Sequence, residues 1–184
     1  MRLWLLLVTA LASPFLCYGL PGKCNPEIIK KISEMWEGNH PRNITETEVG
    51  FVKSVVVWTT HSYYPKDTQC VYSLATNGLL AIVYVYENGD WRAVKRNWIE
   101  KDGYVTNPEI YYEVHYVVLT SDVIATYICD VHGEGKIDAA IIRVKDGYYD
   151  NEKVLAAKHK LESCGLYVTD VYPKCCCEEQ YNHH

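Results

Sequence analysis

Residues 78–98 read GLLAIVYVYENGDWRAVKRNW, and this stretch decides the fold. Two runs of strand-forming residues, 78–87 and 90–98, flank the dipeptide Asn88-Gly89. An Asn-Gly pair between two such runs is the strongest short-range signal for a tight hairpin turn. The stretch therefore predicts two antiparallel strands. The first of them is apolar on both faces, so one face must line a core or cavity and the other must be covered.

The same pattern of short strand-like runs and turns continues on both sides of this hairpin. A second turn signal, Asn77-Gly78, immediately precedes it. No helical pattern separates the runs, so they predict an antiparallel meander that closes into a barrel or a sandwich. The further runs are residues 50–58, 69–76, 109–120, 122–131 and 136–145.

One clear helix is predicted after the last strand, at about residues 151–164. Asp150 is suited to cap its start, and Val154, Ala157 and Leu161 form one apolar stripe. Gly165 ends it. The polar segment before the first strand also has helical character.

The ends of the chain indicate export. Arg2 followed by the apolar run LWLLLVTALA predicts a signal peptide over residues 1–19, which leaves a single domain over residues 20–184. No second apolar run is long enough for a membrane span. The net charge of -5 at pH 7 argues against a nucleic-acid partner. Asn43 begins an N-I-T glycosylation sequon, which fits a secreted protein.

The cysteines predict disulfide bonds rather than a metal site. The chain has eight, of which Cys17 lies in the signal peptide. Exported proteins generally pair their cysteines, and the wide spacing here lacks the C-x2-4-C pairs of a structural zinc site. The run Cys175-Cys176-Cys177 could anchor the tail, residues 165–184, or join two chains.

The order of these features resembles the lipocalin family, in particular the branch of apolipoprotein D, the insect bilin-binding proteins and the crustacyanins. The resemblance begins with PGKC (21–24) and CVYSLATNG (70–78). It is clearest from VVLTSDVIATYIC (117–129) through AAIIRVK (139–145) to GLYVTDVYPKC (165–175).

The resemblance implies an all-β fold: an eight-stranded antiparallel up-and-down barrel, stapled by disulfides, with one C-terminal helix packed outside. Such a barrel is wide enough to hold one small ligand. Residues 90–122 are about one strand shorter than in relatives, so one hairpin is expected to be trimmed. No cofactor is required, although a bound chromophore or lipid would fit the family.

Alternation along the strands then predicts the barrel interior, with Tyr72 placed inward by the family match. The pocket is expected to combine tyrosine hydroxyls with aliphatic walls, which suits an amphipathic or conjugated ligand. The predicted ligand-binding residues are Tyr72, Leu80, Ile82, Tyr84, Tyr86, Val56, Trp58, Ala139 and Ile141.

The family's barrel-closing signature, Gly-x-Trp, is altered here. Gly50 is kept, but Val52 stands where the tryptophan would be. In the family that ring packs beneath an arginine of the last strand, and Arg143 matches that arginine. Trp36, from the preceding segment, is predicted to supply a substitute ring.

The resemblance also implies disulfide partners. The N-terminal cysteine would join the strand before the last, giving Cys24–Cys129, and Cys70 would join Cys175 in the tail. Cys164 has no family counterpart, and a third bond to Cys176 or Cys177 is predicted from its position near the tail. The remaining thiol stays free or links two chains into a homodimer or other disulfide-linked oligomer.

The sequence therefore predicts a secreted carrier for a small hydrophobic ligand: a bilin, carotenoid, retinoid, steroid or fatty acid. The alternative is a secreted protein-binding or inhibitory module that uses the barrel only as a scaffold. No enzyme is predicted, because no nucleophile motif or nucleotide-binding glycine loop is present. Asp122 and Glu113 are more easily explained as strand-end carboxylates than as an acid-base pair.

Overall fold

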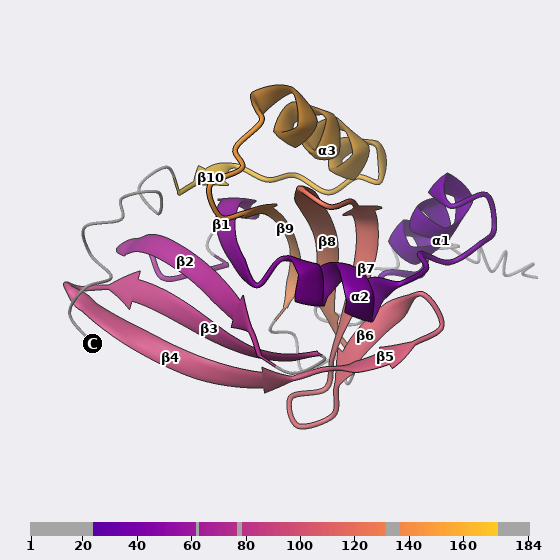
Figure 1. Cartoon of the computed structure of the whole chain (residues 1–184). Helices are drawn as coiled ribbons and strands as arrows, with labels where there is room; N and C mark the ends of the chain where they lie inside the picture. The colour runs from indigo at the N-terminus through magenta and orange to yellow at the C-terminus, as the bar shows by residue number, and fades with distance from the viewer. Residues whose placement is uncertain (1–23, 62, 77–78, 132–136, 173–184) are drawn as a thin grey trace, which may run out of the picture.

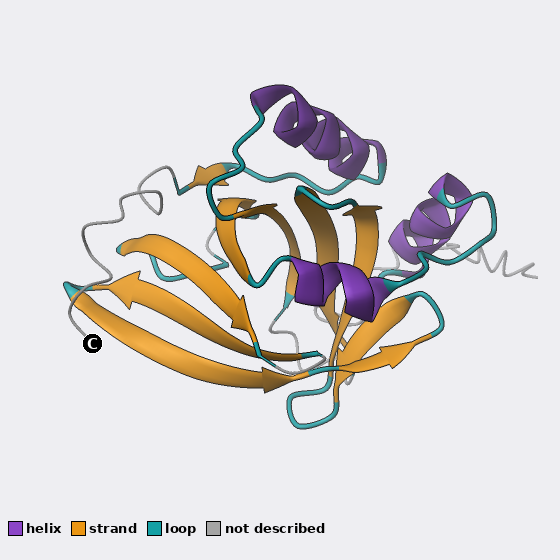
Figure 2. Ribbon diagram, in the orientation of Figure 1, coloured by secondary structure: helices purple, strands orange, loops and turns teal. Residues whose placement is uncertain are grey.

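The computed structural model describes residues 24–61, 63–76, 79–131 and 137–172 (Figure 1). Their strands form one sheet, and helices cover part of its outside (Figure 2). The elements in chain order are α1 (Pro26–Met35), α2 (Ile44–Gly50), β1 (Lys53–Thr59), β2 (Thr68–Ala75), β3 (Leu80–Glu87), β4 (Asp90–Asn97), β5 (Ile99–Lys101), β6 (Tyr104–Asn107), β7 (Tyr112–Leu119), β8 (Val123–Asp130), β9 (Asp138–Lys145), α3 (Asn151–Ser163) and β10 (Asp170–Val171).

The sheet is antiparallel and runs in the order β4-β3-β2-β1-β9-β8-β7-β6-β5, with β10 paired to β1. It curls until its two edge strands, β4 and β5, meet at Trp98, the single residue between them. The Trp98 amide donates to the Leu79 carbonyl at 3.2 Å. This confirms the predicted barrel-type fold with one C-terminal helix, but the strand count is larger than eight. The region expected to be trimmed holds a short β5–β6 hairpin.

The hairpin predicted for residues 78–98 forms around Asn88 and Gly89. Asn88 and Gly89 have φ values of 55° and 83°, and Glu87 pairs with Asp90 across the turn. Two successive positive φ angles are what a tight hairpin turn of this hand requires, which explains the Asn-Gly pair. The second predicted turn, Asn77-Gly78, lies outside the described residues.

The predicted helix is confirmed as α3. The Asp150 side chain accepts hydrogen bonds from the amides of Glu152 and Lys153, at 3.0 and 3.2 Å. The apolar stripe of Val154, Ala157 and Leu161 is buried against β7, β8 and β9. The stripe, α1 and the outward faces of these strands form an outer core.

A second core fills the concave side of the sheet. It gathers the inward residues of β1, β2, β3, β6, β7, β8 and β9 together with α2. Its buried members are Ile44, Phe51, Val56, Val71, Val85, Val105, Val114, Tyr116, Ile124, Ile128, Ile141 and Tyr172. The sheet therefore carries apolar side chains on both faces, as the two-sided pattern of residues 78–87 indicated.

Three register shifts occur in the described sheet, of which one lies between Thr68 and Cys70 of β2. The other two affect the strands whose inward faces line the second core. One lies between Val56 and Trp58 of β1, and the other between Tyr116 and Val118 of β7. At a β-bulge two residues on one strand oppose one on its partner, so the alternation slips by one position. As a result Val57 and Trp58 both belong to the outer core, and the inward placement predicted for Trp58 is wrong.

The start of the first strand also differs from the prediction. Gly50 was expected to open a strand, but it is the last residue of α2, and β1 begins at Lys53. A Cβ added at Gly50 would meet open space, and φ at Gly50 is not positive, so the structure requires no glycine there. The barrel-closing role predicted for Gly50 is therefore wrong.

The cysteines divide into three cases. Cys24 and Cys129 form the predicted disulfide, with their Cα atoms 4.9 Å apart. Cys70 is also disulfide-bonded, while its predicted partner, Cys175, lies outside the described residues. The third predicted bond is absent, because Cys164 is a free thiol. Its side chain is buried at the C-cap of α3, with Sγ 3.7 Å from Met35 Sδ of α1, so it points into the outer core.

Cys176 and Cys177, which were predicted to pair with Cys164, lie outside the described residues. So do the signal peptide (1–19) and the end of the tail. Among the helices of the described ranges, none is both long and apolar enough to cross a membrane.

Candidate ligand cavity

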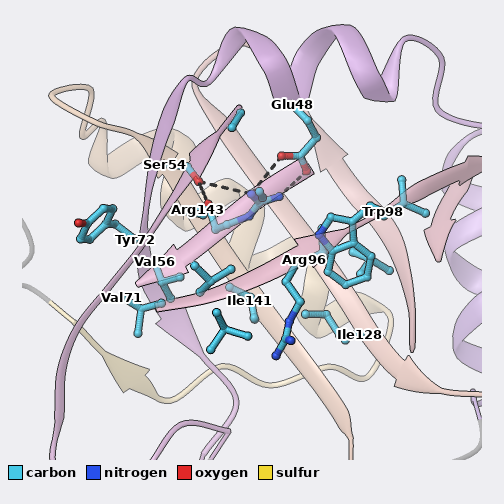
Figure 3. Close-up of a pocket in the computed structure, with 18 of the residues that line it drawn as sticks. Glu48, Ser54, Val56, Val71, Tyr72, Arg96, Trp98, Ile128, Ile141 and Arg143 are labelled. Carbon is cyan, nitrogen blue, oxygen red and sulfur yellow. Dashed lines mark hydrogen bonds and ion pairs between the residues drawn. The ribbon is translucent and has the colours of Figure 1, made fainter. Parts of the chain in front are cut away.

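The concave side of the sheet encloses a cavity of about 320 Å³ (Figure 3). Its walls come from α2, from the inward faces of β1 to β4 and β6 to β9, and from residues 63–65 between β1 and β2. A volume near 300 Å³ is at the lower end of the range for small-molecule sites. The cavity is the candidate functional site.

Most of the wall is aliphatic. Val71 of β2 and Val83 and Val85 of β3 contribute to it, as do Ile128 of β8 and Ile141 of β9. These residues occupy alternate positions of strands whose other faces pack outside, so strand alternation alone places them inward.

Three of the predicted ligand-binding residues border the cavity: Val56, Leu80 and Ile141. Val56 and Ile141 belong to the inner core, whereas Leu80 is the first residue of β3. Tyr72 also borders it, but its ring points away from the other lining side chains in Figure 3. That ring stacks on Tyr84 at a centroid distance of 4.7 Å and an interplanar angle of 8°.

The inward placement of Ile82, Tyr84 and Tyr86 is wrong. The register pairs Tyr72 with Tyr84 and Cys70 with Tyr86, and these residues pack on the outer core together with Trp91. The cavity is lined instead by the alternate residues of the same segment, Leu79, Ala81, Val83 and Val85. A shift of one residue moves every side chain of a strand to the other face. The family match that placed the Tyr72 side chain inward therefore assigned the inward positions of β3 to the wrong face.

Two more predicted residues lie away from the cavity. Trp58 packs outside, where Lys158 Nζ lies 4.1 Å from the centroid of its ring. Ala139 is buried and shares the strand face of Ile141, but it is not part of the cavity wall.

A buried ion pair lies at the α2 side of the cavity. Arg143 of β9 pairs with Glu48 of α2, and Nη1 donates to Oε2 at 3.1 Å. The Tyr116 hydroxyl donates to Glu48 Oε1 at 2.9 Å, and Arg143 Nη1 lies 3.4 Å from Ser54 Oγ. Burial lowers the pKa of Arg143, but Glu48 outweighs this and leaves it raised. Burial and the neighbouring Glu48 carboxylate both raise the pKa of Tyr116, so it stays a donor.

The ion pair replaces the ring contact that was predicted for Arg143. Trp36 lies in the outer core, where its Nε1 donates to the Tyr116 carbonyl at 2.8 Å. The prediction that Trp36 packs beneath Arg143 is therefore wrong. Phe51, directly after α2, and Tyr116 are aromatic residues of the inner core that border the cavity at this end.

A second polar region lies on β4 and the segment before β2. Arg92 and Arg96 of β4 border the cavity together with Tyr63, Tyr64 and Tyr112. Burial raises the pKa of Tyr63 to about 12, an effect that Tyr112 adds to and Arg96 opposes. Burial likewise raises the pKa of Tyr64 well above its ordinary value. These phenols are therefore neutral at physiological pH.

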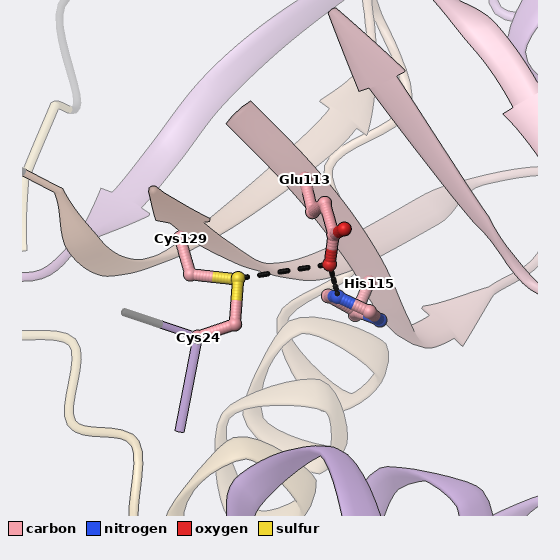
Figure 4. Close-up of side chains that lie close together, drawn as sticks. All are labelled: Cys24, Glu113, His115 and Cys129. Atoms are coloured by element: carbon pink, nitrogen blue, oxygen red, sulfur yellow. Dashed lines mark hydrogen bonds and ion pairs between the residues drawn. A yellow bond between two sulfur atoms is a disulfide. The ribbon is translucent and has the colours of Figure 1, made fainter. Parts of the chain in front are cut away.

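Outside the cavity, four potential metal ligands lie close together around the disulfide (Figure 4). Glu113 Oε2 lies 3.0 Å from His115 Nε2 and 3.6 Å from Cys24 Sγ. Because Cys24 and Cys129 are bonded to each other, neither sulfur is available as a thiolate. Burial lowers the pKa of His115, although Glu113 opposes this. The cluster is therefore a packed histidine-carboxylate pair beside a disulfide.

The two carboxylates considered for acid-base chemistry do not meet. Glu113 pairs with His115, whereas Asp122 pairs with Lys153 at the other end of the β7–β8 hairpin. Asn43 is exposed and makes no capping hydrogen bond through its side chain, so the glycosylation sequon stays a prediction.

Comparison with known proteins identifies the fold. No family model matches the chain, and no curated protein matches it in sequence. Apocrustacyanin C1 matches with a TM-score of 0.58 at 11% identity, covering 86% of this chain and 93% of that one. The siderocalin Ex-FABP matches with a TM-score of 0.57 at 7% identity, covering 70% of this chain and 97% of that one. Lobster apocrustacyanin A1 matches with a TM-score of 0.52 at 14% identity, covering 86% and 93%.

These structures are lipocalins, and the protein has the lipocalin fold. The resemblance drawn from the sequence motifs is confirmed at the level of the fold.

Glu48, Arg96 and Trp98 are among the residues that border the cavity and were not predicted from the sequence. Two of them carried a usable signal. The Asn88-Gly89 turn fixes the pairing of Ala81 with Arg96 and Val83 with Val94, so the inward set of β4 follows once that of β3 is correct. Glu48 had no such signal, because α2 was not predicted.

Proposed function

We propose that the protein is a secreted, non-catalytic carrier that holds a small hydrophobic ligand in the cavity. The observation that supports this best is the cavity itself, about 320 Å³ of space bounded mainly by aliphatic side chains on the concave side of the sheet. Small-molecule sites are typically preformed, mostly apolar and equipped with a few convergent polar groups. The Glu48–Arg143 pair and the neutral phenols of Tyr63 and Tyr64 are such groups.

Secretion is supported by the apolar N-terminal run and by the Cys24–Cys129 disulfide. Disulfides of this kind persist in oxidising compartments and are rare in the cytosol. Expression in cultured eukaryotic cells, followed by N-terminal sequencing of the protein in the medium, tests this part of the proposal. A protein retained in cells with residues 1–19 intact would contradict it.

The carrier function is tested by fluorescence, because Trp98 borders the cavity and reports on an occupant. Retinol, a bilin, a carotenoid, a steroid and a fatty acid are each titrated into the purified protein. A saturable change in tryptophan emission is expected with at least one of them, and Trp98→Phe should lose most of that change.

A cavity-filling variant provides the second arm of the test. Val71→Trp places a large ring in the cavity wall and should abolish ligand binding. Val55→Trp is the control, because Val55 lies on the outer face of the neighbouring strand β1. It tests whether overpacking alone abolishes binding. Circular dichroism confirms that each variant is folded. If no compound of the panel binds the wild type, the barrel is better explained as a scaffold for binding another protein.

A further inference from the structure

One cation at the cavity has no counter-ion among the described residues. Three arginines border the cavity: Arg92, Arg96 and Arg143. Arg143 is paired with Glu48, and Arg92 Nε lies 3.1 Å from Glu87 Oε1. Among the described residues no hydrogen bond or ion pair joins Arg96 to any partner. A half-buried guanidinium without a counter-ion is costly, and an anion brought by a ligand would relieve that cost.

The position of Arg96 suits a ligand contact. It lies opposite Ala81 in the β3–β4 register, and this small neighbour leaves room beside it. In Figure 3 its side chain points toward the part of the cavity that Ile128 and Ile141 line. The guanidinium is thus presented to the cavity from one wall and faces aliphatic side chains of the other.

The neighbouring groups do not neutralise Arg96. Burial holds Tyr63 and Tyr64 in their neutral form, because it raises the pKa of both phenols. Glu48 is the one carboxylate among the described residues that border the cavity, and Arg143 already occupies it. The phenol hydroxyls remain available as hydrogen-bond donors to an anion.

We infer that the cavity selects amphipathic carboxylates, an apolar chain or ring system with one carboxylate that pairs with Arg96. This inference rests on the proposed carrier function and names the ligand class for the same site. The apolar body of the ligand lies along Val71, Val83 and Val85, and the carboxylate accepts paired hydrogen bonds from the planar guanidinium. Neutral compounds of the same shape lack this contact.

The test compares one ligand in two charge states. cis-Parinaric acid and its methyl ester have the same fluorescent chain and differ in the head group. Titration of both into the wild-type protein at neutral pH should show the acid binding about tenfold to a hundredfold more tightly, the range expected for a hydrogen-bonded charged group.

The variants assign this preference to one side chain. Arg96→Gln removes the charge and keeps a side chain of similar polarity. It should weaken binding of the acid by the same factor and leave binding of the ester unchanged. Lys95→Gln is the matched control, since it removes one positive charge from the same strand at an exposed residue that does not border the cavity. Arg96→Lys keeps the charge without the planar fork and should retain part of the preference.

Each outcome decides the question. Equal binding of acid and ester by the wild type overturns the inference while leaving the carrier function in place. An unchanged preference in Arg96→Gln, with its circular dichroism spectrum intact, also overturns it. Binding of neither compound, together with no response to the wider panel, overturns the carrier function and the inference with it.

Discussion

The ion pair between Glu48 and Arg143 joins α2 to the barrel, and its removal is the most informative stability experiment. Glu48→Gln keeps the size of the side chain and removes its charge. Arg143 is then left without a counter-ion, and the Tyr116 hydroxyl loses a charged acceptor for its hydrogen bond. The side chains of Glu48 and Arg143 are only 15% and 18% exposed. Water can therefore replace little of the lost interaction with Arg143.

The expected cost follows from this burial. Removing one partner of a buried ion pair costs about 3–5 kcal/mol, and the residual exposure places this pair near the lower end, at about 3 kcal/mol. For a domain of this size each kcal/mol shifts the melting temperature by about 2–4 °C, which predicts a fall of about 6–12 °C. The slope of the denaturant transition should not change, because the surface exposed on unfolding is the same.

The assay is urea and thermal unfolding followed by circular dichroism, with Asp122→Asn as the matched control. Asp122 also pairs with a cation, Lys153, but the Lys153 side chain keeps 54% of its exposure. Exposed pairs contribute little, so this control should leave the unfolding midpoint almost unchanged. If Glu48→Gln and Asp122→Asn give equal midpoints, α2 is not held by a buried charge and the reasoning fails.

Three further predictions concern the outer core and the disulfide. Burial lowers the pKa of His115 below its usual 6.5, so on acidification the unfolded chain binds the proton before the folded chain does. The free energy of unfolding should therefore decline as the pH falls from 6.5 toward the lowered pKa. His115→Phe should flatten this decline in a series of urea titrations at different pH. Replacing Cys24 and Cys129 by serine opens a link between residues 105 apart and should cost about 4–5 kcal/mol in the free energy of unfolding, whereas an unchanged urea midpoint would refute the stabilising role. Leu161→Ala should lower the free energy of unfolding by about 2–5 kcal/mol because Leu161 is fully buried. Leu155→Ala, on the exposed side of the same helix, should lower it far less. Equal losses in the two variants would mean that α3 does not pack as described.

The elements that depend on local chemistry could be predicted from the sequence. Asn88-Gly89 requires the positive φ angles that the turn shows, and Asp150 with the Val154-Ala157-Leu161 stripe specifies α3. The Cys24–Cys129 bond followed from the family resemblance. These features are decided by a few neighbouring residues or by a motif, so long-range packing does not change them.

The choice of inward face could not be predicted in the same way. Residues 78–87 are apolar on both faces, so hydrophobicity gives no marker of direction. The choice rested on the family match, which placed Tyr72 inward and set the count from Gly78. The bulge after Val56 then reversed the direction of Trp58. Both errors come from register, which depends on how strands pair rather than on the composition of one strand.

The missed helix has a different cause. α2 spans seven residues, Ile44–Gly50, too few to show a helical period, and a helix this short is marginal without tertiary contacts. It forms against the barrel, where Ile44 is fully buried and Glu48 meets Arg143. Its existence therefore depends on partners that lie about 100 residues away along the chain, as Glu48 and Arg143 do.

The meeting of β4 and β5 at Trp98 has a consequence for self-association. These strands end the hydrogen-bonded order of the sheet, and an edge strand offers unpaired backbone groups to any other chain. β4 carries Arg92 and Lys95, and β5 carries Glu100 and Lys101, all of them exposed. Charged side chains on an edge oppose the approach of a second sheet. The barrel can therefore keep an incompletely paired seam without exposing an aggregation-prone strand.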